Sequence, residues 1–173
     1  AGGRISRVTF SNGDRYEGQF KDGLFHGWGV YTYHNGDRYE GEFVRDRKEG
    51  RGTLVFHNGD RYTGDFKNDM MHGNGTLTYR NGNRYVGDFQ LGVRHGNGTL
   101  TFHNGDVYAG EFRDDRRTGR GRYTFADGSR YVGEFDDGRR HGDGRYVYAS
   151  GETYAGQFRD GRKNGVGVCI YPD

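Results

Sequence analysis

The sequence predicts an all-β protein, an elongated single-layer antiparallel β-meander solenoid built from 23-residue hairpin repeats. Three observations carry this prediction: a gapless recurrence of aromatic residues, glycine columns at the same step, and a short turn signal in most repeats. Glycine supplies 34 of the 173 residues, and there is one proline. Collagen is excluded, because its triple helix needs glycine at every third position and abundant proline.

Tyrosine recurs at a step of 23 residues with no insertion or deletion. The seven positions are Tyr16, Tyr39, Tyr62, Tyr85, Tyr108, Tyr131 and Tyr154. A phenylalanine column keeps the same step at Phe20, Phe43, Phe66, Phe89, Phe112, Phe135 and Phe158. Four glycine columns, typified by Gly13, Gly18, Gly27 and Gly29, run in parallel with them. The unusual composition is therefore the composition of the repeat.

The residue pattern within each repeat predicts two short strands. In residues 15–20, Tyr16, Gly18 and Phe20 alternate with polar residues, which places two rings and a glycine on one side of a strand. Residues 27–33 alternate in the same way, with glycines and aromatic rings on one side. Because both connections are short, consecutive strands must pair antiparallel, and the chain becomes one meander of about fifteen strands.

The turn signal between repeats is an Asn-Gly pair. It occurs at Asn35-Gly36 and recurs at Asn12, Asn58, Asn81 and Asn104. A type I′ turn needs positive φ at both central residues, which asparagine and glycine tolerate best. The sequence therefore predicts type I′ turns at these pairs.

The repeat also sets the expected domain organisation. Residues 1–7 are predicted to be the N-terminal remnant of a partial repeat, and residues 8–173 an array of seven repeats that start at the seven tyrosines. The array begins in half a repeat and ends where another turn would begin. We therefore expect the chain to be a piece of a longer array.

The unit of residues 16–29, Tyr-Glu-Gly-Gln-Phe-Lys-Asp-Gly-Leu-Phe-His-Gly-Trp-Gly, closely resembles the MORN (membrane occupation and recognition nexus) repeat. The resemblance covers residues 8–171 in seven copies. It implies an interaction module, and an array of this kind is most similar to the MORN-array cytoskeletal scaffolds of single-celled parasites. The resemblance thus implies a cytoskeletal or scaffold protein as partner. It also implies a cytoskeleton-associated location, which would lie near a membrane if the chain binds lipid.

The sequence predicts no enzyme activity, no cofactor and no metal site. It contains neither a nucleophile elbow nor a Walker loop, and no pair of residues has the spacing of a metal site. Each unit repeats its neighbour, whereas catalysis needs one unique arrangement. The formal net charge is +2 with both signs interspersed, which argues against nucleic acid as a partner. The sequence has no apolar run long enough for a signal peptide or membrane span, so we expect a cytoplasmic protein.

The first candidate site is an aromatic groove on the ring-bearing side of the sheet. Its predicted residues are Tyr16, Phe20, Tyr39, Phe43, Tyr62, Phe66, Tyr85 and Phe89. A curled sheet could leave these rings open to an extended or helical segment of a partner. The alternative is that the rings fill the space by themselves and form the core.

The second candidate site consists of basic pairs in the loops after the phenylalanines. The predicted anion-binding residues are Arg116, Arg117, Arg139, Arg140, Arg162 and Lys163. Stacked repeats would place the arginines in a column about 10 Å apart, a spacing that could meet phosphoinositide headgroups or another anionic phospholipid. Neighbouring aspartates at the same tips argue for the alternative, in which the charges cancel.

The third candidate site is the C-terminal strand. Its predicted dimer-interface residues are Val166, Val168, Cys169, Ile170 and Tyr171. An apolar last strand has a free row of backbone amides and carbonyls that could pair with a second copy through a two-fold axis. The alternatives are that the array continues beyond it, or that Pro172 blunts the edge.

Together these observations predict a non-enzymatic structural scaffold and protein-interaction module that dimerises tail-to-tail as an antiparallel homodimer. The alternative function is binding of phosphoinositides or an anionic membrane surface.

Overall fold

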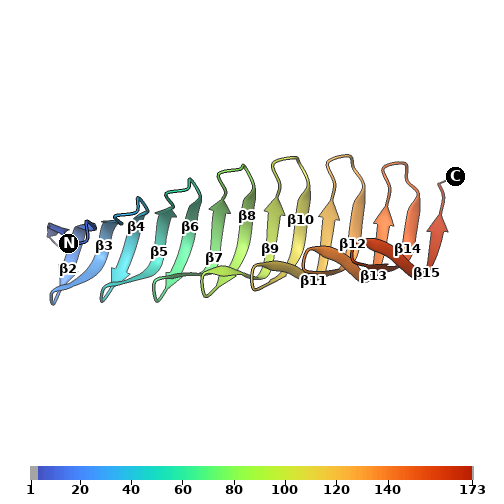
Figure 1. Ribbon diagram of the computed structural model, residues 1–173. Coiled ribbons are helices and arrows are strands. Elements are labelled where there is room, and N and C mark those ends of the chain that lie inside the picture. Colours follow the sequence, from blue (N-terminus) through green and yellow to red (C-terminus); the bar gives the residue numbers. More distant parts are fainter. Residues whose placement is uncertain (1–3, 173) are drawn as a thin grey trace. The chain divides into compact units, whose positions relative to one another are not determined.

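The computed structural model describes residues 4–172, which form strands joined by short loops (Figure 1). The strands are β1 (Ile5–Thr9), β2 (Arg15–Lys21), β3 (Leu24–Thr32), β4 (Arg38–Val44), β5 (Arg47–Val55), β6 (Arg61–Lys67), β7 (Met70–Thr78), β8 (Arg84–Gln90), β9 (Val93–Thr101), β10 (Val107–Arg113), β11 (Arg116–Thr124), β12 (Arg130–Asp136), β13 (Arg139–Val147), β14 (Thr153–Arg159) and β15 (Arg162–Ile170). Their order in the sheet is their order in the chain, and the residues described contain no helix. The predicted all-β antiparallel meander is confirmed. Residues 1–3 of the predicted N-terminal remnant, and Asp173, lie outside the described residues.

The chain divides into two compact units. The first comprises residues up to Gly82 together with Phe89–Gly92, and the second comprises Asn83–Asp88 and the chain from Val93 onward. The same register recurs inside each unit, because the repeat has no insertions. In the first unit glycine lies opposite glycine at Gly64 and Gly75, and in the second unit at Gly133 and Gly144.

Buried tyrosines and phenylalanines form the core of the first unit. The ring of Tyr39 contacts Phe43 of its own repeat and Phe66 of the next, with centroids 5.0 Å apart in both pairs and the rings edge to face. The exposed fraction is 0% for Tyr39 and 3% for each of these phenylalanines. The ladder continues through Tyr16 and Phe20 on one side, and through Tyr62 and Phe89 on the other.

The second unit has a ladder of the same kind. Tyr108 contacts Phe112 at 5.3 Å and Phe135 at 5.0 Å, again edge to face. Its other members are Tyr85, Tyr131, Phe158 and Tyr154. Edge-to-face pairs place the positive rim of one ring against the negative face of another, which adds to the free energy of burial. Each ladder therefore replaces the aliphatic core that the composition lacks.

The glycine pairs make room for the tyrosine rings. A Cβ atom added to Gly29 would lie 2.5 Å from the ring of Tyr16 and closer still to its hydroxyl oxygen. The Tyr16 hydroxyl donates a hydrogen bond to the backbone carbonyl of Gln19 at 2.6 Å. Burial raises the pKa of Tyr16 to about 12. The ring is thus sealed against the backbone, and any side chain larger than hydrogen at Gly29 would displace it.

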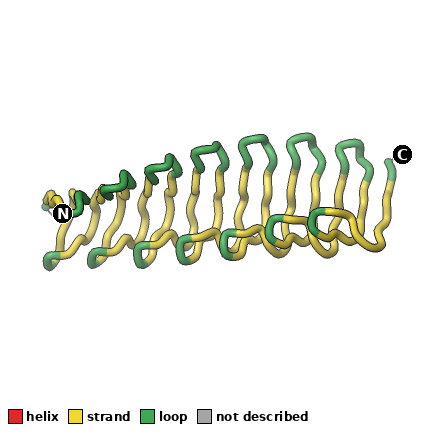
Figure 2. Tube along the Cα trace, viewed as in Figure 1, coloured by secondary structure: helices red, strands yellow, loops and turns green. Residues whose placement is uncertain are grey.

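The two kinds of loop lie at opposite ends of the strands (Figure 2). The predicted type I′ turn at the Asn-Gly pairs is wrong, because Gly36 has φ of +102° while Asn35 keeps a negative φ. The Gly36 amide donates to the Tyr33 carbonyl at 2.9 Å, and the Tyr33 amide donates to the Asp37 carbonyl at 2.8 Å. These bonds define a type I turn followed by a left-handed glycine. The Asn35 side chain accepts the Asp37 amide at 2.9 Å, which explains the asparagine.

The two-residue turns lie instead after the phenylalanines. Asp22 and Gly23 have φ of 53° and 78°, and Arg45 and Asp46 have φ of 47° and 70°. Positive φ at both positions is the geometry of a type I′ turn, which matches the twist of the flanking strands. Aspartate tolerates this region because its short polar side chain bonds locally.

A bulge bends the second strand of each hairpin. Gly18 lies opposite Gly29 and Phe20 lies opposite Phe25, so Gln19 faces three residues. Gly27, one of the three, has φ of +82°. The Gln19 side chain accepts the freed amide of Trp28 at 2.8 Å. Carboxylates do the same in later repeats, at Glu42, Asp65, Asp88, Glu111 and Glu134. The position therefore needs an acceptor side chain.

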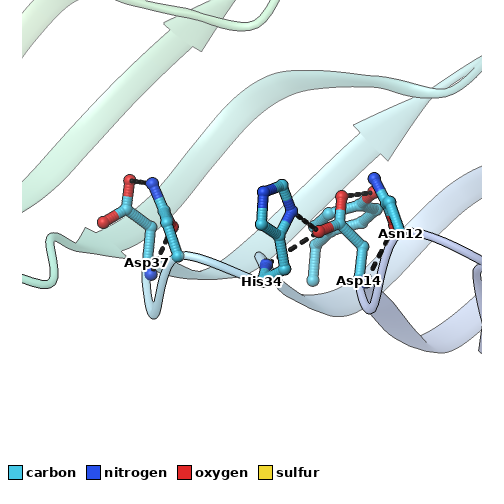
Figure 3. Close-up of polar contacts among 6 residues, drawn as sticks. Asn12, Asp14, His34 and Asp37 are labelled. Carbon is cyan, nitrogen blue, oxygen red and sulfur yellow. Dashed lines mark hydrogen bonds and ion pairs between the residues drawn. The ribbon is translucent and has the colours of Figure 1, made fainter.

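The carboxylate of Asp14 links the loop after β1 to the loop after β3 (Figure 3). Asp14 Oδ1 accepts the His34 amide at 2.7 Å and lies 2.8 Å from His34 Nδ1, while Tyr31 donates its hydroxyl to Oδ2 at 2.6 Å. The Tyr31 hydrogen bond is the largest cause that lowers the pKa of Asp14 to about 2. Asp37, Asp60, Asn83 and Asp106 accept the corresponding amide of the following loop.

We expect acid to destabilise the first unit through Asp14. Its pKa is lower in the folded chain than the ordinary 3.8, so the unfolded chain binds more protons and stability falls between about pH 4 and about pH 2. Asp14→Asn should make thermal stability less dependent on pH in this window, with a lower Tm at about pH 5 and little difference at about pH 2. Thermal unfolding followed by circular dichroism measures both. Asn83→Asp, at the equivalent position, is the matched control, and it should make the Tm depend more steeply on pH in the same window.

Candidate partner-binding groove

One position of each hairpin covers the face of the core tyrosine. Phe25 holds it in the first repeat and stacks on Tyr16 with centroids 3.9 Å apart and planes at 14°. The equivalent residues are Lys48, Met71, Arg94, Arg117, Arg140 and Lys163. Phenylalanine, methionine, lysine and arginine share a long apolar stem or a flat face that can lie on a ring. We call these seven residues the cap column.

The basic members of the cap column lie over the rings as cations. In the second unit the Arg140 guanidinium carbon is 5.0 Å from the Tyr146 centroid and 5.4 Å from that of Phe158. Arg117 lies 5.7 Å from Tyr108, and Lys163 Nζ lies 4.7 Å from Tyr154. These are cation–π distances, at which the ring face attracts the charge.

A second row of rings lies beside the cap column and is only half-buried. In the second unit this row consists of Phe102, Tyr123, Phe125, Tyr146 and Tyr148. Its members pack against each other, with Tyr123 and Phe125 centroids 4.6 Å apart and Phe125 and Tyr146 centroids 5.8 Å apart. We call these five residues the outer ring row.

Members of the outer ring row and of the cap column line an open pocket of about 270 Å³ in the second unit. Its lining includes Arg117, Arg140, Tyr123 and Phe125. Flat rings beside fixed guanidinium groups can hold an extended peptide by stacking, and can pair with an acidic side chain. This part of the second unit is the candidate groove.

The eight rings predicted for an aromatic groove belong to the buried ladders rather than to an open surface. All but Phe20 are buried, with exposed fractions of 0–1% for the tyrosines and 3% for Phe43, Phe66 and Phe89. These rings seal the core, and they offer little surface to a partner. The open aromatic surface is the outer ring row, which has the same 23-residue step.

The structure separates the two members of each predicted basic pair. Arg116, Arg139 and Arg162 are exposed at the start of their strands, and Arg116 lies 3.6 Å from the carboxylate of Asp137. Arg117 and Arg140 instead belong to the cap column, as does Lys163, which remains exposed. Sequence reasoning missed this division. The sequence contained a signal for it, because the second residue of each basic pair stands at the repeat position that apolar Phe25 and Met71 occupy in earlier repeats.

Four of the five predicted interface residues lie on β15, and Tyr171 directly follows this strand. β15 pairs with β14 and ends the sheet. The exposed fractions are 86% for Val166, 60% for Val168 and 50% for Ile170. Tyr171 is 67% exposed, and Cys169 is a free, exposed cysteine. The apolar edge that the sequence predicted is therefore accessible.

The family of the chain follows from a comparison with family models. The MORN repeat model matches residues 16–38, 39–61, 62–84, 85–107, 108–130, 131–153 and 154–173. This chain belongs to the MORN repeat family. The resemblance inferred from the tyrosine and glycine columns is confirmed over the seven repeats. A search of curated protein sequences found no significant match.

Solved structures resemble this MORN chain at low identity. The TCP domain of Drosophila melanogaster SAS-4, solved in complex with a proline-rich motif of Ana2, is 17% identical, has a TM-score of 0.55, and is matched over 89% of this chain and 84% of that one. The TCP10c domain of Drosophila melanogaster Sas-4 is 15% identical with a TM-score of 0.46, over 98% and 100% of the two chains. At 17% identity, the likeness to the first domain shows the fold alone.

Two features are absent from the described part of the MORN array. No helix there is long and apolar enough to span a bilayer. Residues 4–172 also contain no cluster of three or more histidine, cysteine, aspartate or glutamate side chains placed to hold a metal ion.

We expect the cap column to stabilise the array by covering rings rather than by carrying charge. Arg140→Ala should lower the free energy of unfolding by about 2 kcal/mol, since it removes both the cation–π contact and the apolar stem. Arg140→Met should cost less than about 1 kcal/mol, because methionine fills this position at Met71. Urea denaturation of the two variants measures the difference. Equal losses would show that the charge itself is required.

Proposed function

We propose that this MORN array is a non-enzymatic scaffold and protein-interaction module, which binds an extended segment of a partner protein in the candidate groove. The observation that carries the proposal is the outer ring row beside Arg117 and Arg140, half-buried and open to solvent around a pocket of about 270 Å³. A scaffold needs such a surface, and catalysis would need a unique constellation of reactive groups that a repeat does not supply.

Flat aromatic surfaces favour a proline-rich segment. Proline segments adopt the polyproline II conformation in advance, so they lose little entropy on binding, and their rings stack on tyrosine and phenylalanine. The SAS-4 domain with the same fold was solved with a proline-rich motif. The nearby guanidinium groups of Arg117 and Arg140 further favour an acidic residue beside the prolines. Such a partner agrees with the cytoplasmic, cytoskeleton-associated location that the sequence predicts.

A labelled peptide tests groove binding. The probe is a fluorescein-tagged ten-residue peptide rich in proline with two aspartates, and fluorescence polarisation measures its Kd. Phe125→Ala should weaken binding tenfold or more, because it removes a ring from the pocket lining. Phe56→Ala, at the same repeat position in the first unit, should change the Kd less than twofold. Equal Kd values for the wild type and Phe125→Ala would contradict the proposal.

We also propose that the chain dimerises tail-to-tail through β15. The strand ends the sheet, and a two-fold axis would let its free amides and carbonyls pair with those of a second copy as an antiparallel homodimer. Val168 and Ile170 are 60% and 50% exposed, so pairing would also bury apolar surface.

Mass measurement tests the dimer. Multi-angle light scattering should give twice the chain mass for the wild type and the single chain mass for Val168→Glu with Ile170→Glu, since two carboxylates would repel their symmetry mates. Val86→Glu places the same charge on an exposed valine of an internal strand and should leave the dimer intact. A monomeric wild-type chain would overturn this proposal.

Binding to phosphoinositides or an anionic membrane surface is the alternative function. The exposed arginines Arg116, Arg139 and Arg162 support it. We favour the protein partner, because Asp137 neutralises part of this charge at 3.6 Å from Arg116. Cosedimentation with phosphatidylserine vesicles that is lost in Arg139→Gln with Arg162→Gln would reverse this preference.

A further inference from the structure

The face of the sheet opposite the tyrosine ladder has a charge pattern that differs between the two units. One row of side chains crosses the strands on this face. In the first unit the row contains Arg7, Glu17, Val30, Glu40, Thr53, Thr63 and Thr76. In the second unit it contains Thr99, Ala109, Arg122, Val132, Arg145, Ala155 and Val168. The acids of the first unit are absent from the second unit's row.

Three arginines of the second unit gather around one valine. Arg122 on β11 and Arg145 on β13 both lie opposite Val132 of β12, so they flank it at about 10 Å from each other. Arg130 lies two residues before Val132 on the same face of β12, about 7 Å away. We call these four residues the arginine strip.

The arginines of the strip are exposed. Among residues 4–172, no carboxylate lies within ion-pair distance of Arg122, Arg130 or Arg145, and Val132 is 36% exposed. The first unit differs, since Arg7 lies 3.4 Å from Glu17. Unpaired guanidinium groups that repel one another raise the free energy of the isolated chain, and an anionic partner would lower it.

The nearby acids are held away from the strip. Glu111 accepts the Arg120 amide, and Glu134 accepts the Asp143 amide at 3.2 Å, so both carboxylates are fixed at the bulges. They lie in the next row along the strands. The row that contains Arg130 crosses the strands from β9 to β15 and is also free of acids. Its residues are Thr101, Val107, Thr124, Arg130, Val147, Thr153 and Ile170.

We infer that the arginine strip binds an extended acidic segment of a partner protein. The acid-free surface is two rows wide, which fits one extended chain, and a segment that carries both carboxylates and an apolar side chain meets the arginines and Val132 together. A bilayer is a broad anionic plane and would also meet Glu111, Glu134 and Asp143 in the next row. A peptide avoids them, so the pattern favours the peptide.

A peptide of alternating glutamate and valine tests the inference. The probe is a fluorescein-labelled octapeptide, (Glu-Val)₄, titrated with the full chain at low and at physiological salt. Arg122→Gln with Arg145→Gln should raise its Kd tenfold or more. Arg116→Gln with Arg139→Gln removes the same charge at the hairpin tips and should change the Kd less than threefold. Circular dichroism confirms that both double variants are folded.

The two double variants distinguish binding at the strip from attraction to net charge. Equal weakening by both would mean attraction to net charge alone, and no weakening by the first would mean that the strip is not the site; either overturns the inference. The inference is also overturned if phosphatidylserine vesicles bind through Arg122 and Arg145 while the peptide does not bind. Because the strip lies on the face opposite the groove, Phe125→Ala should leave binding of this octapeptide unchanged, and failure of groove binding would leave the inference standing.

Discussion

The contact between a tyrosine ring and a pair of facing glycines is the constraint on which the rest of the array depends. Tyr16 lies against Gly18 and Gly29 so closely that neither position has space for a Cβ atom, and its hydroxyl closes the contact with the Gln19 carbonyl. The ring is thereby buried inside a single sheet, without a second layer to cover it. This explains how a chain with few aliphatic residues forms a stable core.

The same contact fixes the position of the candidate groove. A ring lying flat on the backbone leaves one face to be covered, and the cap column covers it with phenylalanine at Tyr16, arginine at Tyr108 and lysine at Tyr154. The basic side chains that stabilise the core thus also line the groove beside the outer ring row. The proposed recognition would use the same residues that cover the core rings, so a variant that keeps the apolar cover but removes the charge, such as Arg140→Met, separates the two roles.

The repeat makes each unit alike, and the proposed arginine strip lies where the sequence departs from it. On the face opposite the rings the repeat imposes no packing requirement, so side chains there are free to vary. Glu17 and Glu40 of the first unit are replaced by Ala109 and Val132 in the second, while Arg122 and Arg145 appear where the first unit has valine and threonine. A repeat protein acquires a directional surface in this way without altering its core.

The sequence by itself determined the fold class, the strand order and the family, because the core contacts are local and recur every 23 residues. It also indicated the exposed valines of β15. It did not determine which loop is the type I′ turn, since Asn35 acts as a side-chain acceptor and Asp22 adopts positive φ. Nor did it show that Arg117 covers a ring while Arg116 is exposed, or that Arg122 and Arg145 flank Val132 on the two neighbouring strands. Those relations depend on the bulge and on cross-strand register, which only the tertiary structure decides.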